Sequence, residues 1–167
     1  MSDWLETGVK PKLFTLGLKK LKIKPDSCTS LTIFNIDTIR PNFLHPELNS
    51  NVDGYLEVFR GEGDNWSFVQ PKSSESPQVI LTTEKKPISD LCSTGLYYFS
   101  SFYLFEKSYQ NYINRPKDSW VNGEIYIAPL YNYLIENGFY IEYVEINKSE
   151  VLFSGTPEEY LELKCDF

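Results

Sequence analysis

Residues 83–99, TEKKPISDLCSTGLYYF, join a charged Glu84-Lys85 pair to a glycine, Gly95, that opens an aromatic run. Residues 94–99 predict a β-strand, because aromatic and β-branched residues favour strands. A glutamate accepts hydrogen bonds from hydroxyl groups, and a lysine supplies a point charge for a phosphate. A glycine lets the backbone approach a ligand closely. Taken singly, the pair is also typical of a solvated loop and the glycine of a bulge or a packed strand.

Outward from this stretch, strand-like runs alternate with helix-like ones. The predicted strands are residues 31–35, 53–58, 66–69, 79–83, 94–99, 139–146 and 151–154. The predicted helices are roughly 12–22, 101–113, 124–136 with Gly138 as its C-cap, and 157–164 with Thr156 as its N-cap. The run 31–35 is expected to be buried on both faces, and 66–69 and 79–83 to form an antiparallel pair joined by the loop 71–77. This alternation predicts an α/β fold with three αβα layers around a mostly parallel, mixed sheet.

Composition and charge exclude several classes of function. The chain has 167 residues and a net charge of −7, which disfavours a nucleic-acid partner because a polyanion needs a basic face. Cys28, Cys92 and Cys165 lack metal-ligand spacing and predict free thiols in a reducing cytoplasm. No apolar run approaches the roughly 18 residues of a membrane span, and there is no signal-peptide core. We therefore expect a cytoplasmic protein that binds no membrane, in which the single histidine, His45, is not catalytic.

Asp37 follows directly after the predicted strand at 31–35. Open α/β sheets bind ligands beyond the carboxyl ends of their strands, and a carboxylate there is a hard oxygen ligand suited to Mg²⁺. The alternative from the residues alone is a turn residue at a strand end.

Three further motifs accompany residues 83–99: IFNID at 33–37, NGE at 122–124, and Gly-Thr-Pro at 155–157. Over residues 31–164 these motifs resemble the sugar-phosphate nucleotidyltransferase family, of the glucose-1-phosphate thymidylyltransferase-like kind, and match only its C-terminal portion. Members of this family join a sugar 1-phosphate to a nucleoside triphosphate (NTP) and release pyrophosphate. The resemblance implies a Rossmann-like nucleotide-diphospho-sugar transferase fold and a role in surface-polysaccharide precursor synthesis.

The resemblance also implies a role for each matching residue. Asp37 is expected to bind Mg²⁺, and Asp37 and Lys85 to be catalytic. Glu84 is expected to contact the sugar, Lys85 its phosphate, and Gly95 to let the backbone approach the sugar ring. Glu124 is expected to bind substrate at the opening of a helix that Asn122 caps, although capping alone also explains both residues.

The sequence departs from the family pattern in two places. Many members carry a second metal-binding aspartate two residues before the glycine of the Gly-Thr-Pro motif, where this chain has Phe153. The family also begins with a Gly-rich, basic loop that wraps the NTP phosphates, whereas residues 1–30 contain only Gly8 and Gly17. We therefore expect a single, N-terminally truncated domain over residues 1–167, with 1–30 poorly matched.

The missing loop leaves two functions open. The first is a nucleotidyltransferase-like enzyme, inactive alone, that acts on a sugar 1-phosphate or similar phosphorylated small molecule. The second is a non-catalytic sugar-phosphate-binding or regulatory module that pairs with another chain. A homo-oligomer or a separate N-terminal half would cover a sheet edge left without its first strands.

Overall fold

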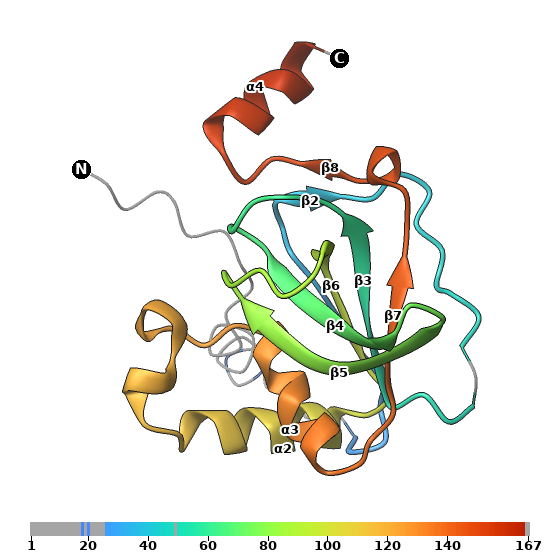
Figure 1. Ribbon diagram of the computed structural model, residues 1–167, viewed down its shortest axis with the longest axis vertical. Helices are drawn as coiled ribbons and strands as arrows, with labels where there is room; N and C mark the ends of the chain where they lie inside the picture. Colours follow the sequence, from blue (N-terminus) through green and yellow to red (C-terminus); the bar gives the residue numbers. More distant parts are fainter. Residues whose placement is uncertain (1–17, 19, 21–25, 49, 166–167) are drawn as a thin grey trace.

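A computed structural model describes residues 18, 20, 26–48 and 50–165 (Figure 1). The fold is mixed α/β, as predicted. A six-stranded sheet comprises β1 (Leu31–Phe34), β3 (Gly54–Arg60), β4 (Ser67–Ser73), β5 (Ser76–Glu84), β6 (Leu91–Phe99) and β7 (Ile141–Glu145), and a two-stranded sheet comprises β2 (Thr38–Ile39) and β8 (Leu152–Phe153). The predicted helix at 12–22 lies almost wholly outside the described residues.

The strand order of the large sheet is β1-β6-β3-β7-β5-β4. Among the described strands, only β3 and β7 pair in parallel; the other pairings are antiparallel. The mixed sheet is thus confirmed, but the expectation that it is mostly parallel is wrong. The reason is that β6 runs antiparallel to both of its neighbours, β1 and β3, and β5 runs antiparallel to β7. The predicted antiparallel pair of β4 and β5 is confirmed, although its strands extend to Ser73 and Ser76 and leave a much shorter loop than predicted.

Strand β1 lies at an edge of the sheet and pairs with β6 alone in the described chain. Ile33 is buried, whereas Thr32 is exposed. The prediction that this strand is buried on both faces is therefore wrong: its apolar run packs one side against the core.

Helices α2 (Phe102–Ile113) and α3 (Tyr131–Glu136) lie on one side of the large sheet (Figure 1). The hydroxyl of Ser101 caps α2 by accepting a hydrogen bond from the Leu104 N–H at 3.3 Å. Tyr131 is fully buried and stacks on Phe99 with ring centroids 4.5 Å apart, while its hydroxyl donates to the carbonyl of Tyr98. These helices and strands β3, β6 and β7 enclose the main core.

The predicted helix at 124–136 is shorter than expected. Residues 124–127 precede a single 3₁₀ turn (Ala128–Leu130), and α3 begins only at Tyr131. Pro129 fits a first turn but not a helix interior, because it lacks an N–H. Asn122 therefore does not cap this helix; it has φ +52° within another 3₁₀ turn (Val121–Gly123). Gly138 adopts φ +81° directly after the α3 C-cap Asn137, which confirms its predicted place.

The β2–β8 ribbon lies at the opposite end of the molecule from α2 and α3 (Figure 1). A buried ion pair fixes it to the large sheet: Arg40, next to β2, donates from Nε and Nη2 to the two Glu57 carboxylate oxygens at 2.9 and 3.1 Å. The hydroxyl of Thr94 donates to the same carboxylate at 2.9 Å.

Helix α4 (Pro157–Cys165) follows β8. The Thr156 hydroxyl accepts from the Glu159 N–H at 3.2 Å, and the Glu159 carboxylate accepts from the Thr156 N–H at 2.9 Å. This reciprocal capping box confirms Thr156 as the predicted N-cap. Of the helices described, none combines the length and apolar character that crossing a bilayer requires.

Candidate functional site

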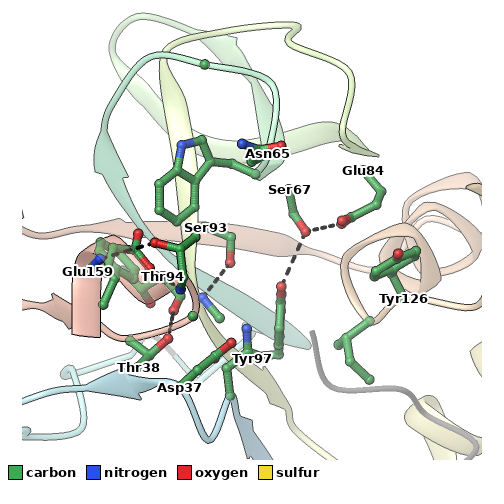
Figure 2. Close-up of a pocket in the computed structure, with 18 of the residues that line it drawn as sticks. Asp37, Thr38, Asn65, Ser67, Glu84, Ser93, Thr94, Tyr97, Tyr126 and Glu159 are labelled. Atoms are coloured by element: carbon green, nitrogen blue, oxygen red, sulfur yellow. Dashed lines mark hydrogen bonds between the residues drawn. The ribbon is translucent and has the colours of Figure 1, made fainter. Parts of the chain in front are cut away.

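A cavity of about 300 Å³ opens between the large sheet, the β2–β8 ribbon and the start of α4. Three of the five predicted site residues line it: Asp37, Glu84 and Gly95. The other lining residues are Asn35, Thr38, Glu62, Gly63, Asn65, Trp66, Ser67, Ser93, Thr94, Tyr97, Tyr126, Ile127, Phe153, Gly155, Thr156 and Glu159. In Figure 2, Glu84 and Tyr126 lie at one side of the view and Glu159 at the other, with Asp37 and Tyr97 between them.

Asp37 is placed by its neighbours along the ribbon. Its carbonyl oxygen accepts hydrogen bonds from the Ser154 N–H at 2.8 Å and the Ser154 hydroxyl at 3.0 Å. The adjacent Thr38 hydroxyl donates to the Thr94 carbonyl at 3.0 Å. Partial burial raises the pKa of the Asp37 carboxyl; a hydrogen bond from its own backbone N–H opposes this rise, and the charge of Glu159 adds to it.

Glu84 is the most buried acidic group of the cavity, with 7% of its surface exposed. The Ser67 hydroxyl donates to its Oε2 and lies 3.4 Å from the Tyr97 hydroxyl (Figure 2). Burial raises the pKa of Glu84, against the opposing effects of the Ser67 hydrogen bond and the charge of Lys85. Burial, with the charge of Glu84 next, also raises the pKa of Tyr97 to about 12. The Ser67 hydroxyl on β4 thus lies between the buried Glu84 carboxylate on β5 and the Tyr97 hydroxyl on β6.

Gly95 lies in the middle of β6 rather than at its start, and has φ +91°. A Cβ at this position would collide with the side chain of Asn35, whose backbone N–H donates to the Gly95 carbonyl at 3.1 Å. The lack of a Cβ at Gly95 therefore makes room for the Asn35 side chain, which packs against the β6 backbone here.

Lys85 and Glu124 do not line the cavity. Both contact Tyr126, which does: Lys85 Nζ lies 3.3 Å from the Tyr126 hydroxyl, and this hydroxyl lies 3.3 Å from Glu124 Oε2. Lys85 follows the end of β5 with φ +53°, and its N–H donates to the Trp66 carbonyl at 2.9 Å. Tyr126 therefore separates both predicted residues from the cavity.

Phe153, which replaces the second aspartate of the family pattern, also faces this cavity. Its ring lies 4.8 Å from the Trp66 ring and 5.2 Å from the Phe59 ring, between centroids. An aromatic side chain thus lines the cavity at the position where the family pattern has a carboxylate. The acidic neighbour of Asp37 in this structure is Glu159, from the first turn of α4.

Sequence reasoning missed four of the lining residues that matter most for the chemistry: Ser67, Tyr97, Tyr126 and Glu159. Ser67 and Tyr97 belong to predicted strands, but their relation to Glu84 depends on the register of β4, β5 and β6. Glu159 was recognisable as the N3 residue of a capping box, a pattern that explains it without any ligand.

The structural neighbours are sugar nucleotidyltransferases, which supports the family resemblance found in the sequence. A UDP-glucose pyrophosphorylase in complex with UDP-glucose has a TM-score of 0.70 at 12% identity over 96% of this chain and 61% of the other. A protein from Bacillus anthracis, assigned as a glucose-1-phosphate thymidylyltransferase and bound to sucrose, has a TM-score of 0.67 at 17% identity over 96% of this chain and 61% of the other. These two likenesses concern the fold.

A much stronger similarity exists to the nucleoside-diphosphate-sugar pyrophosphorylase from Vibrio cholerae RC9. The two chains share 52% identity and a TM-score of 0.84, over 90% of this chain and 62% of that one. This chain therefore spans about three fifths of the length of each of these neighbours. No family model matches the sequence, and no curated protein matches it either.

Proposed function

We propose that the cavity binds the phosphorylated acceptor of a nucleotidyl transfer, a sugar 1-phosphate or similar phosphorylated alcohol. The observation that carries this proposal is the convergence of Asp37, Glu84 and Gly95 on one cavity. These residues lie on three different strands or strand ends, and the family resemblance assigns Asp37 to the metal and Glu84 and Gly95 to the sugar. The 52% identity to a nucleoside-diphosphate-sugar pyrophosphorylase supports the same class of reaction.

In the proposed reaction, a phosphate oxygen of the acceptor attacks the α-phosphorus of an NTP. A new P–O bond forms, the bond from the α-phosphorus to the bridging oxygen breaks, and pyrophosphate leaves. Such a transfer depends on positioning and on neutralising charge. Glu84 accepts hydrogen bonds from the acceptor, the backbone at Gly95 contacts it, and Lys85 pairs with its phosphate once it leaves the Tyr126 hydroxyl.

The residues present fit a Mg²⁺ ion at the Asp37 end of the cavity. This ion is usually held by one or two carboxylates together with substrate phosphates. Asp37 supplies one carboxylate, and Glu159, whose Oε2 alone accepts the Thr156 N–H, supplies a second. Among the residues that the structure describes, no group of three metal-ligating side chains occurs, so the phosphates would complete the shell. When bound, Mg²⁺ would neutralise phosphate charge.

Isothermal titration with glucose 1-phosphate in the presence of Mg²⁺ tests the acceptor site. Lys85→Ala should weaken binding by about tenfold or more, because a charged hydrogen bond to phosphate is lost. Lys86→Ala is the matched control, since Lys86 is the exposed next residue. Equal binding by both variants and the original chain would contradict the assignment of Lys85.

A second candidate is the non-catalytic sugar-phosphate-binding or regulatory module. It is favoured by Phe153 in the second-metal position of the family pattern. Pyrophosphate release with NTP, acceptor and Mg²⁺ distinguishes the two: release means transfer, and acceptor binding without release means a binding module. A place in surface-polysaccharide precursor synthesis, in the cytoplasm, belongs to the first candidate and rests on the family resemblance.

A further inference from the structure

Among the described residues, the charged side chains that line the cavity are all acidic. Four carboxylates line it, from Asp37, Glu62, Glu84 and Glu159, and none of the described lining residues is a lysine, arginine or histidine. A phosphorylated acceptor is itself an anion, so this lining repels it unless cations are bound as well. Mg²⁺ at Asp37 and Glu159 would neutralise one end of the cavity and leave Glu84, at the other end, with only the nearby charge of Lys85, which is not hydrogen-bonded to it.

The carboxylate of Glu84 can accept further hydrogen bonds. It is 93% buried, and its one hydrogen bond in the described chain is from the Ser67 hydroxyl to Oε2. An ionised carboxylate offers about four acceptor sites, and a buried charge is costly without a partner. The neighbouring Lys85 is not this hydrogen-bond partner, because its Nζ lies 3.3 Å from the Tyr126 hydroxyl oxygen instead.

The rest of the lining near Glu84 also suits a cation. Tyr97 and Tyr126 line the cavity, and the charge of Glu84 acts on both of their hydroxyl groups. The faces of aromatic rings attract ammonium groups. A neutral hydroxyl also satisfies Glu84 as a donor, but it leaves the buried charge in place.

We propose that the acceptor carries a protonated amine, as an amino sugar 1-phosphate or an amino alcohol phosphate does, and that this amine donates to Glu84. This inference rests on the proposed function and specifies its substrate class. The amine donates to Glu84 beside Tyr97 and Tyr126, while the phosphate pairs with Lys85 and with the metal at Asp37. The amine thus offsets the charge of Glu84, and the metal offsets the charges of Asp37 and of the phosphate.

Isothermal titration of two matched pairs of probes, with Mg²⁺ at pH 7, tests this proposal. The two probes of each pair differ in charge but have nearly the same shape. The first pair is glucosamine 1-phosphate and glucose 1-phosphate; the second is ethanolamine phosphate and 2-hydroxyethyl phosphate. In at least one pair the amine should bind about tenfold more tightly, the gain expected from a charge-assisted hydrogen bond with a cation–π contact.

The variant Glu84→Gln should abolish this preference between the amine and the neutral probe. Glu106→Gln, which changes an exposed carboxylate on α2, should keep the preference. Neutral probes that bind as tightly as the amines in both pairs overturn the amine assignment and leave the proposed function standing. A preference that survives in Glu84→Gln overturns the assignment of Glu84. If none of the four probes binds, both the inference and the proposed function fail.

Discussion

The Asp37 carbonyl oxygen accepts two hydrogen bonds from Ser154, one from its N–H at 2.8 Å and one from its hydroxyl at 3.0 Å. These residues are 117 positions apart, and the bonds continue the pairing of β2 with β8. The backbone of the predicted metal ligand is thus fixed by the segment that contains the Gly-Thr-Pro motif. The motif at 33–37 and the Gly-Thr-Pro motif at 155–157 therefore form one structural unit, although they are far apart in the sequence.

Replacing Ser154 with alanine should remove the hydroxyl bond and keep the N–H bond. We expect a loss of about 1 kcal/mol in the free energy of unfolding, the usual net contribution of a partly buried hydrogen bond. Urea denaturation followed by circular dichroism measures it. Ser119→Ala, which removes a local hydroxyl bond to the Pro116 carbonyl at the surface, should cost less. An equal or larger loss in Ser119→Ala would contradict the importance of the link to Asp37.

Gly95→Ala should be much more harmful than an alanine at another glycine with positive φ. At Gly95, a Cβ adds a collision with Asn35 to the strain of φ +91°, and we expect a cost of about 1–3 kcal/mol or more. Gly138→Ala is the matched control, because φ is +81° there and no atom lies within 4 Å of the added Cβ. Equal losses of unfolding free energy in the two variants would show that backbone strain alone decides both.

The buried Arg40–Glu57 pair should be sensitive to the loss of either partner. Glu57→Gln leaves the guanidinium of Arg40 buried without its counter-charge, and we expect a loss of about 3–5 kcal/mol. The control is Glu145→Gln, which breaks the exposed pair with Arg60 and should change stability little. Thermal unfolding of both variants measures the difference. A melting temperature unchanged in Glu57→Gln would mean that the pair is not needed to hold the ribbon.

The raised pKa of Glu84 predicts how stability depends on pH. Because the folded state raises this pKa above the ordinary value of 4.5, folding favours the protonated form. Ionising Glu84 in the folded state therefore costs stability. This cost is absent when the pH is below the ordinary pKa, grows as the pH rises toward the raised pKa, and is complete above it. Glu84→Gln should be more stable than the original chain at pH 7, and the gain should shrink toward pH 4. Unfolding by urea at several pH values checks this, and a gain that grows as the pH falls would contradict the sign.

Local patterns predicted most of the elements and part of the site. The helix at Phe102–Ile113 and the strands around β3, β5 and β6 were predicted closely, because periodicity and turn residues act over short distances. The helix at 124–136 was too long because apolar spacing there fits both a helix and an extended segment packed on the core. Strand direction depends on connections, so the sequence did not reveal that β3 and β7 are the only parallel pair among the described strands.

The sequence likewise predicted one part of the site, while another part depends on packing between strands. Motif resemblance predicted that Asp37, Glu84 and Gly95 belong together, and all three line the cavity. The Ser67 bond to Glu84 and the position of Tyr126 between Lys85 and the cavity depend on side-chain packing across strands. No spacing in a single sequence encodes such contacts.

The β2–β8 ribbon also sets the order in which the site can be completed during synthesis. Asp37 leaves the ribosome early, since chains emerge N-terminal end first, and its partner Ser154 follows 117 residues later. Phe153, Gly155 and Glu159 arrive with Ser154. A nascent chain can pair β3 with β6 long before it can close the cavity. The cavity is therefore completed after the sheet, and a translation product that stops before Phe153 would contain most of the sheet without a closed cavity.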